Sequence, residues 1–339
     1  MQRGGTLREF CLACDGRGLD SWPEHRAKPG KGAIVGILNV NKPLGITSHD
    51  VVDRVRKASG IRRVGHAGTL DPAASGVLLV CLGQATRVSK YLMESRKRYD
   101  AQIRLGISTD SGDTEGKTIY QAAEVKVTRE QFEQALSLFL GRIEQIPPMH
   151  SALKHEGTAL YKLARRGIEV KRTPRPVEIH NLELTVWTPP LLRLTVECSK
   201  GTYIRALARD LGEKLGSGAH LQSLVRLASG PFTLDKAVSL SAVEESFAKG
   251  YWPQILHPLD EALLHYEAAI VDQETEKKIR QGQPVLGLEP LNTPLCRVYS
   301  SSGRFIALLR YDQKRKVWQP RKVFNLDEDN TWSGRYNSG

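Results

Sequence analysis

The chain has 339 residues, 40% of them hydrophobic and 25% charged, an ordinary composition for a globular protein. Lys and Arg exceed Asp and Glu by 12, and this excess favours a polyanionic partner such as nucleic acid over a role in solubility alone. Five cysteines are too few for a disulfide framework, no apolar run approaches a membrane span, and no apolar signal core lies near the first residue, so we expect a cytoplasmic protein.

Residues 1–32 are rich in Gly, Pro and charge and lack hydrophobic periodicity, so we expect a flexible extension. Within it, Cys11 and Cys14 have the C-x-x-C-x-G-x-G spacing that is similar to half of a DnaJ-type zinc knuckle. Zinc needs four ligands, and only His25 offers a third. We therefore expect no metal, with an exposed thiol pair as the interpretation and a zinc site as the alternative.

The first structured segment is an apolar run at 34–40, which predicts a buried strand. A turn from Lys42 to Ser48 follows. Ser48 is expected to cap a helix that continues to about residue 58 and carries valines on one face.

The stretch from Gly65 to Gly76 contains three glycines and the pair Asp71-Pro72, and it leads into the apolar run Val77–Leu82. Glycine permits backbone angles that are closed to other residues and lets a ligand approach closely. Proline restricts the preceding aspartate to an extended or turn geometry. The pattern by itself is compatible both with a structural Asx-turn and with an acid presented to a ligand beside a buried strand.

Helices and strands alternate beyond this loop. We expect a helix over 85–93, a half-buried strand over 97–106 with Tyr99 near its start, and a helix from the capping box at 128 to about 140. The polar loop 109–116 lacks the spacing and closing Glu of a calcium-binding EF-hand.

A basic segment follows at 152–176, with seven Lys or Arg against two acids. Tyr161, His150 and His155 are interleaved with it or flank it. A solvated charged face is the alternative, but basic residues mixed with stackable rings favour contact with RNA phosphates and bases.

The run 192–197 alternates like a strand and leads through Tyr203 into a helix that ends near residue 215. Arg205 at this strand-to-helix junction could reach a carboxylate from another loop. After a connector with a short helix at 241–249, short alternating runs from residue 268 onward predict a small β-barrel.

Several of these segments resemble, in order, motifs of the TruB family of pseudouridine synthases. They are K-P-x-G-x-[ST]-S from Lys42, G-H-x-G-x-L-D-P-x-A-x-G from Gly65, C-S-x-G-T-Y-I-R from Cys198, and the run that begins at Gly218. Asn41 stands where the family usually has Asp, which puts nothing catalytic in doubt.

The resemblance covers residues 33–265 and implies an α+β pseudouridine synthase fold. This fold has a central mixed, mostly antiparallel β-sheet flanked by helices, with an RNA-binding insertion at about 145–176. A weaker resemblance implies a small C-terminal PUA-like RNA-binding β-barrel at 266–326, and we expect a loose tail at 327–339.

The implied activity is the isomerisation of uridine to pseudouridine in RNA, at uridine 55 in the T loop of tRNA, without a cofactor or metal. Asp71 matches the catalytic aspartate, Arg205 would hold it ionised, and Tyr99 would stack on the uracil and help remove the C5 proton. The further residues that the resemblance assigns to substrate contact or loop support are His66, which would fill the space of a flipped base, Asp113, Tyr203 and Leu224 near the pocket, and Lys42 and Lys154.

Three alternatives stay open from sequence. One is a guide-RNA-dependent synthase of the dyskerin type, against which the basic insertion argues, so we expect no guide RNA. The second is a non-catalytic RNA chaperone, and the third is a carboxylate-dependent hydrolase, for which no second acid accompanies Asp71. We expect the protein to act as a monomer. Whether Asp71 attacks C1′ or C6 or acts on C2′ is not fixed by sequence.

Overall fold

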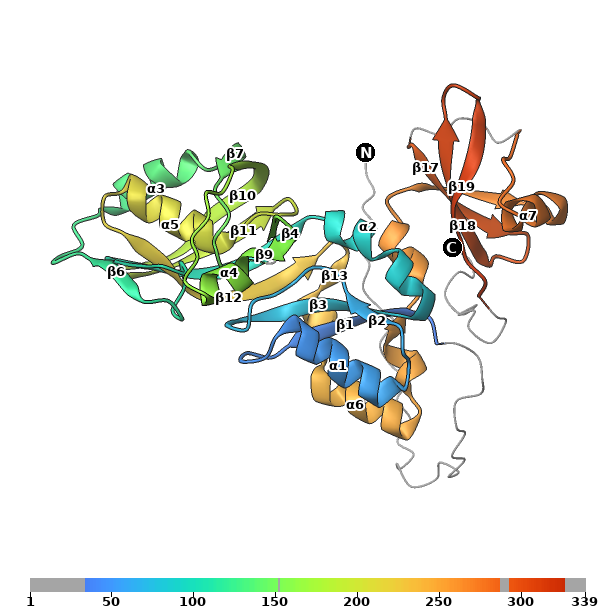
Figure 1. Cartoon of the computed structure of the whole chain (residues 1–339), viewed down its shortest axis with the longest axis horizontal. Coiled ribbons are helices and arrows are strands. Elements are labelled where there is room, and N and C mark those ends of the chain that lie inside the picture. The colour runs from blue at the N-terminus through green and yellow to red at the C-terminus, as the bar shows by residue number, and fades with distance from the viewer. Residues whose placement is uncertain (1–33, 152, 287–292, 327–339) are drawn as a thin grey trace, which may run out of the picture. The chain divides into compact units, whose positions relative to one another are not determined.

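The computed structural model describes residues 34–151, 153–286 and 293–326 (Figure 1). The described residues therefore exclude Cys11 and Cys14. Most of them form an α+β arrangement on an eleven-stranded sheet, whose main path runs β14-β1-β3-β12-β4-β11-β10-β7. The strands of this sheet are β1 (Gly36–Lys42), β2 (Val64–His66), β3 (Ala74–Leu82), β4 (Lys97–Leu105), β7 (Gly141–Gln145), β10 (Arg175–Thr188), β11 (Leu191–Cys198), β12 (Ala219–Ser229), β13 (Phe232–Thr233), β14 (Val238–Ser239) and β15 (Leu256–His257).

The sheet is mixed and mostly antiparallel, as predicted. Within the described residues, β1 with β14 and β3 with β12 are its parallel pairs, and its other neighbouring strands run antiparallel. Two short hairpins lie outside it, formed by β5 (Ile107–Thr109) with β6 (Thr118–Gln121) and by β8 (Lys154–His155) with β9 (Thr158–Ala159).

Four helices supply apolar side chains to a large core that also contains one face of the sheet. They are α1 (Ser48–Ser59), α3 (Arg129–Ser137), α5 (Ile204–Lys214) and α6 (Leu240–Lys249). Figure 1 shows α1 beside α6, and α3 beside α5 over another part of the sheet. The shorter helices are α2 (Ser89–Glu94), α4 (Leu160–Arg165) and α7 (Gln273–Arg280), with 3-10 turns η1 (Gly83–Arg87), η2 (Leu234–Lys236), η3 (Trp252–Ile255) and η4 (Leu259–Leu263).

The central strand β3 is buried on both faces. Leu78 and Val80 belong to the core under the four helices, whereas Leu79 and Cys81 belong to a second core that includes Phe324. Because successive residues of a strand point to opposite faces, a continuous apolar run is required here. The loop that carries Asp71 enters β3 and is therefore attached to the most buried strand of the domain.

One predicted helix start was wrong, and one predicted helix is divided in two. The N-cap of α1 is Thr47, which forms a reciprocal capping box with Asp50, and Ser48 is the first helical residue. The helix expected over 85–93 is divided into η1 and α2. The capping box at Thr128 and Gln131 is confirmed at the start of α3.

The C-terminal strands β16 (Glu267–Val271), β17 (Leu295–Ser300), β18 (Phe305–Asp312) and β19 (Val317–Val323) form a separate four-stranded sheet in that order. This PUA-like sheet has its own core around Trp318, and α7 contributes Ile279 to it. Phe305, Leu308 and Phe324 pack instead into the second core, against the eleven-stranded sheet. None of the helices that the structure describes is long and apolar enough to span a membrane.

Candidate active site

The loop before β3 is held by the turn that precedes α1. The Ser48 hydroxyl accepts a hydrogen bond from the Leu70 amide at 2.8 Å and donates to the Leu70 carbonyl at 3.0 Å. The Gly45 amide donates to the Pro72 carbonyl at 2.9 Å. Two sequence motifs that lie more than twenty residues apart thus bind each other's backbone on both sides of Asp71, which restricts where its carboxylate can lie.

Gly76 allows the next strand to approach this loop. It pairs with Arg226 in the parallel contact of β3 with β12 and has a φ of 101°. A Cβ atom added at Gly76 would lie 2.3 Å from the Arg226 carbonyl oxygen, which is not possible without a backbone shift. The glycine is therefore required for the pairing that brings β12 beside Asp71.

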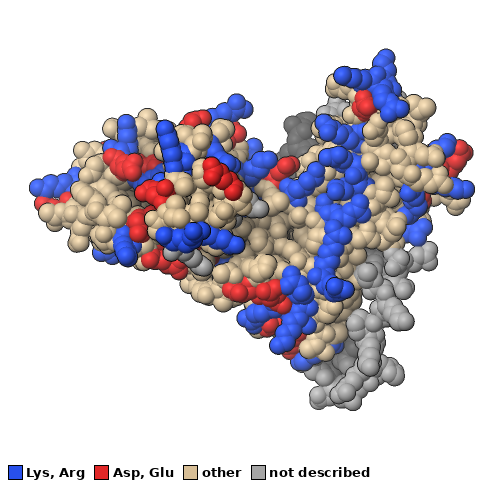
Figure 2. All heavy atoms as spheres, viewed as in Figure 1, with Lys and Arg blue, Asp and Glu red and all other residues tan. Residues whose placement is uncertain are grey.

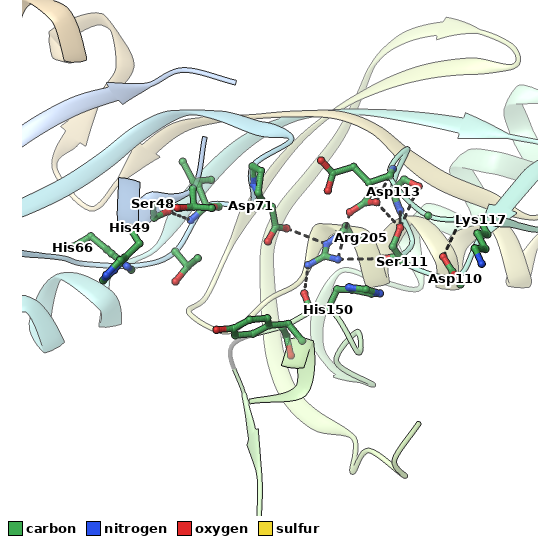
Figure 3. Close-up of a pocket in the computed structure, with 18 residues that line it drawn as sticks. Ser48, His49, His66, Asp71, Asp110, Ser111, Asp113, Lys117, His150 and Arg205 are labelled. Carbon is green, nitrogen blue, oxygen red and sulfur yellow. Dashed lines mark hydrogen bonds and ion pairs between the residues drawn. The ribbon is translucent and has the colours of Figure 1, made fainter. Parts of the chain in front are cut away.

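The Asp71 carboxylate faces the guanidinium of Arg205, and Asp113 lies on another side of the same guanidinium (Figure 3). The Arg205 Nε lies 3.0 Å from Asp71 Oδ2, and its Nη1 lies 3.4 Å from Asp113 Oδ2. Arg205 also donates to the carbonyls of Ser111 at 3.2 Å and His150 at 2.7 Å. With 5% of its side chain exposed, Arg205 is held from three segments and has little freedom to move.

Asp71 differs from Arg205 in exposure, because 40% of its side chain remains accessible. Crowding by protein atoms nevertheless raises the pKa of the Asp71 carboxyl above its ordinary value; Arg205 opposes this rise, and the negative charge of Asp113 adds to it. Arg205 therefore acts on this carboxyl in the expected direction, towards the ionised form. Arg205 limits the upward shift of the pKa but does not reverse it.

Two cavities meet at this ion pair. The first, of about 680 Å³, extends from the start of α1 past His66 to the loop that carries Asp113. The second, of about 500 Å³, lies beside Tyr99. Asp71 and Arg205 line both cavities. Both volumes fall in the range of small-molecule sites, about 300–1,000 Å³.

The second cavity collects the predicted pocket residues Tyr99, Tyr203 and Leu224. Tyr99 is buried in β4, and this burial raises the pKa of its hydroxyl, although the nearby Arg226 guanidinium opposes the shift. Tyr203 is fixed through its backbone, because the buried Gln145 side chain accepts from its amide at 2.9 Å and donates to its carbonyl at 3.0 Å.

His66 lines the first cavity together with His49, and Figure 3 shows the two rings side by side, on the opposite side of Asp71 from Arg205. Burial lowers the pKa of His66, and the charges of His49 and Arg226 lower it further. Its Nδ1 atom is buried and has no hydrogen-bond partner among the described residues. His66 therefore presents a neutral ring at the entrance to the loop of Asp71.

Three other residues were assigned to substrate contact or loop support, and two of them have described side chains. Lys42 is fully buried and donates to the carbonyls of Pro43 at 2.8 Å and Ile46 at 2.7 Å, so it stabilises its own turn and cannot reach a phosphate. Asp113 is 6% exposed and directs its carboxylate at Arg205 and the Ser111 hydroxyl. The side chain of Lys154 lies outside the described part of the structure.

Two buried cations near the second cavity were missed by the sequence analysis. Lys97, whose ammonium group donates to carbonyls at the end of α2, has its pKa lowered by burial to about 8. Arg226 is 2% exposed. The available signal was the two-residue spacing that puts Lys97 on the face of Tyr99 and Arg226 on the face of Leu224.

The described residues contain no group of three or more His, Cys, Asp or Glu side chains arranged to hold a metal ion. Their cysteines Cys81, Cys198 and Cys296 are all free and buried, and burial raises the pKa of each thiol. The chemically distinctive feature of this region is thus the exposed carboxylate beside a buried guanidinium.

Comparison with known proteins agrees with this geometry. Residues 56–204 match the model of the TruB family pseudouridylate synthase N-terminal domain, and residues 205–270 match the tRNA pseudouridylate synthase B C-terminal domain. The chain is 46% identical over 290 residues to a protein named tRNA pseudouridine synthase B from Dehalococcoides mccartyi, covering 85% of this chain and 96% of that protein. A protein of the same name from Thiobacillus denitrificans is 42% identical over 296 residues and is covered over 98% of its length.

Solved structures also match. The structure titled "Crystal Structure of a Cbf5-Nop10-Gar1 Complex" contains a chain with a TM-score of 0.66 and 26% identity, with 86% of this chain and 85% of that chain covered. A chain in "Structure of H/ACA RNP bound to a substrate RNA containing 2'-deoxyuridine" has a TM-score of 0.65 at 24% identity over the same shares and shows the fold alone. From the family models and the relatives that match along most of its length, this chain belongs to the TruB family of pseudouridine synthases.

Proposed function

We propose that this protein isomerises uridine to pseudouridine in tRNA, at uridine 55 of the T loop, with Asp71 as the catalytic carboxylate. The observation that carries the proposal is the Asp71–Arg205 pair, in which a partly exposed carboxylate lies 3.0 Å from a buried guanidinium where two cavities meet. Curated relatives at 42–46% identity bear the name tRNA pseudouridine synthase B, which supports tRNA as the substrate.

A uridine inside a folded loop is not accessible to Asp71, so the nucleotide must be turned out at a cost of about a few kcal/mol. In our proposal the uracil enters the cavity beside Tyr99 and Leu224, and the flanking RNA lies in the cavity beside His66. This places the sugar of the flipped nucleotide next to Asp71, which lines both cavities. The neutral His66 ring would stack in the space that the base leaves.

The reaction breaks the N1–C1′ bond, turns the uracil and joins C5 to C1′, while C5 loses a proton and N1 gains one. Substrate and product contain the same atoms, so the reaction is redox-neutral. Three roles are chemically open to Asp71: attack on C1′, attack on C6, or removal of the C2′ proton. Each requires the ionised carboxylate, and Arg205 favours that form because its charge opposes the effect of burial. Tyr99 would stack on the uracil and help remove the C5 proton.

Surface charge supports binding of a polyanion. Basic side chains gather in a strip on the face shown in Figure 2. One basic cluster is formed by Arg63, Arg87, Lys90, Arg321 and Lys322, which come from the catalytic and C-terminal parts of the chain. Burial lowers the pKa of Lys322, and the four neighbouring cations lower it further. A cluster of like charges without acids among these interactions is suited to a row of RNA phosphates.

We further propose that the basic insertion at 145–176 and the PUA-like domain at 266–326 contribute RNA contacts, so that a monomer acts without a guide RNA. The relatives that are matched over 96–98% of their own length are named tRNA pseudouridine synthase B, and their names mention no guide RNA or partner protein. The matching chains from the H/ACA and Cbf5 complexes have lower identity, 24–26%.

The test is release of tritium from C5-labelled uridine 55 in a T-loop hairpin, using purified protein and no guide RNA. We expect release, because C5 gives up its proton when it bonds to C1′. A matched hairpin that carries the label on another loop uridine should release none. No release from either the hairpin or whole tRNA would overturn the proposal, and release only after addition of a guide RNA would support the guide-dependent alternative. Light scattering of the protein and of its RNA complex gives their masses and checks that a single copy of the protein binds the RNA.

A further inference from the structure

Arg226 is a buried cation without an acidic partner among the described residues. It belongs to β12 and lines the second cavity. The guanidinium donates from Nε to the Val77 carbonyl at 2.7 Å, from Nη2 to the Gly68 carbonyl at 3.0 Å, and from Nη1 to the Thr69 carbonyl at 3.5 Å. Burying a charge without a counter-ion is unfavourable, so a purely structural role would be met better by an apolar side chain.

The carbonyls that Arg226 binds lie on both sides of Asp71 in the chain. Gly68 and Thr69 precede it, and Val77 follows it within β3. A single planar guanidinium therefore joins the two ends of the loop that presents the carboxylate. Arg205 holds the carboxylate itself, so the loop backbone on either side of Asp71 and the Asp71 side chain are bound by different arginines.

Arg226 also lies opposite the other predicted catalytic group. It is the register partner of Tyr99 where β12 pairs with β4, and its positive charge opposes the rise in the pKa of the Tyr99 hydroxyl. Tyr99 belongs to β4, whereas Asp71 lies in the loop before β3. Arg226 binds that loop and pairs with Tyr99 in the sheet, and all three residues line the second cavity.

We propose that Arg226 is a positioning residue that fixes the Tyr99 hydroxyl and the Asp71 loop relative to each other. The inference rests on the proposed function, since it concerns the same site. The fork of a guanidinium can bind several carbonyls and a hydroxyl in one plane, whereas an ammonium group cannot reproduce that geometry. Misplacement of reacting groups by about 1 Å can reduce a rate by about 10²-fold.

The test is Arg226→Lys, which retains the charge and loses the fork. We expect RNA binding and KM to stay within about threefold of the parent, while kcat for tritium release falls by about 10²-fold. The matched control is Arg297→Lys, because Arg297 also donates to a backbone carbonyl, that of Tyr266 at 2.9 Å, and is likewise close to a tyrosine, whose hydroxyl accepts from it at 2.7 Å. The control should lower thermal stability at least as much and leave kcat unchanged.

A double-mutant cycle with Tyr99→Phe, under single-turnover conditions, tests the link to the phenol. Arg226→Lys should cost less in the Phe background, because the hydroxyl that it positions is already missing. Should the lysine variant not fold, Arg226→Gln serves instead, since it removes the buried charge but can still donate to one carbonyl. A kcat within threefold of the parent in a folded Arg226 variant, or an equal loss in both backgrounds, would overturn the inference. An inactive parent would reject the proposed function instead.

Discussion

Two arginine clusters among the described residues show what an open site needs: the one around Asp71 lines two cavities, whereas the other joins the C-terminal sheet to the rest of the chain. In the C-terminal cluster, Arg297 donates to the Tyr299 hydroxyl at 2.7 Å, and that hydroxyl donates to Asp260 at 2.7 Å. Asp260 belongs to η4 and Tyr299 to β17, so the cluster joins the catalytic part to the C-terminal sheet. The Tyr299 hydroxyl thus accepts one hydrogen bond and donates another, so both of its hydrogen-bonding functions are used within the cluster.

The cluster around Asp71 leaves hydrogen-bonding capacity unused. One Asp71 oxygen contacts Arg205, while the side chain remains 40% exposed at the junction of two cavities. Burial raises the pKa of Asp71, and it likewise raises the pKa of Tyr299 in the C-terminal cluster. A shifted pKa therefore does not distinguish the two clusters. What distinguishes them is whether an acid is open to an incoming ligand.

The largest difference should appear when one carboxylate is removed from each cluster. We expect Asp71→Asn to abolish tritium release from the T-loop hairpin and to leave RNA binding within about tenfold, because the amide cannot act as a nucleophile or base. Asp260→Asn should leave release unchanged, since its carboxylate contacts Tyr299 and faces no cavity of the site. Turnover retained by Asp71→Asn would exclude the proposed mechanism.

The pH dependence of stability gives a second test of Asp71→Asn. The folded-state pKa of Asp71 is raised, so the folded protein binds this proton more tightly than the unfolded chain does. Protonation of Asp71 therefore stabilises the folded state. This contribution is complete below the ordinary carboxyl pKa of 3.8 and is lost as pH rises through the folded-state pKa. We therefore expect Asp71→Asn to be at least as stable as the parent at pH 7, with the difference vanishing in acid, as measured by urea unfolding across pH.

The next largest effect is expected for Arg205→Lys. An ammonium group can keep a charge near Asp71, but it cannot also hold Asp113 and the carbonyls of Ser111 and His150. We expect kcat to fall by about 10²-fold with a smaller change in KM, measured by tritium release at saturating hairpin. A variant with normal kcat would show that the fixed direction of the Asp71 carboxylate does not matter.

Much of the fold follows from local patterns in the sequence. The capping box of Thr128 and Gln131 depends on residues three apart, and it was placed correctly. The break between η1 and α2 depends on residues far away, because Arg87 donates to the Val323 carbonyl at 2.6 Å and Gln84 to that of Asn325. Such tertiary contacts override a local helix pattern and cannot be read from it.

The candidate site likewise has features that follow from sequence motifs and features that depend on tertiary contacts. The resemblance to a family brought Asp71, Arg205 and Tyr99 together correctly as neighbours of one cavity. It left Lys42 between substrate contact and loop support, since residue type alone does not reveal that this lysine is fully buried and binds its own turn. The two-residue spacing from Leu224 puts Arg226 on the same face of its strand, but the contacts of Arg226 depend on the register of β12 with both β3 and β4, which that spacing does not determine.

A smaller effect is expected for Asp113→Asn, in the form of a shifted pH profile. Asp113 contributes to the raised pKa of Asp71, so removal of its charge should lower that pKa. Because the reaction needs the ionised carboxylate, the single-turnover rate rises with pH through the pKa of Asp71. The acidic limb of the rate profile should therefore move to lower pH in the variant. Movement to higher pH would show that Asp113 acts mainly by holding Arg205.

The smallest effect on turnover is expected for Tyr299→Phe, which tests the independence of the two clusters. The variant deprives Asp260 of its donor and Arg297 of an acceptor, so we expect unfolding in urea to cost about 1–3 kcal/mol less. Tritium release from the hairpin should remain at the parent level below the unfolding transition, because neither group lines the cavities around Asp71. A parallel loss of turnover would mean that docking of the C-terminal sheet controls the geometry of the Asp71 site. The C-terminal cluster and the cluster around Asp71 would then be coupled.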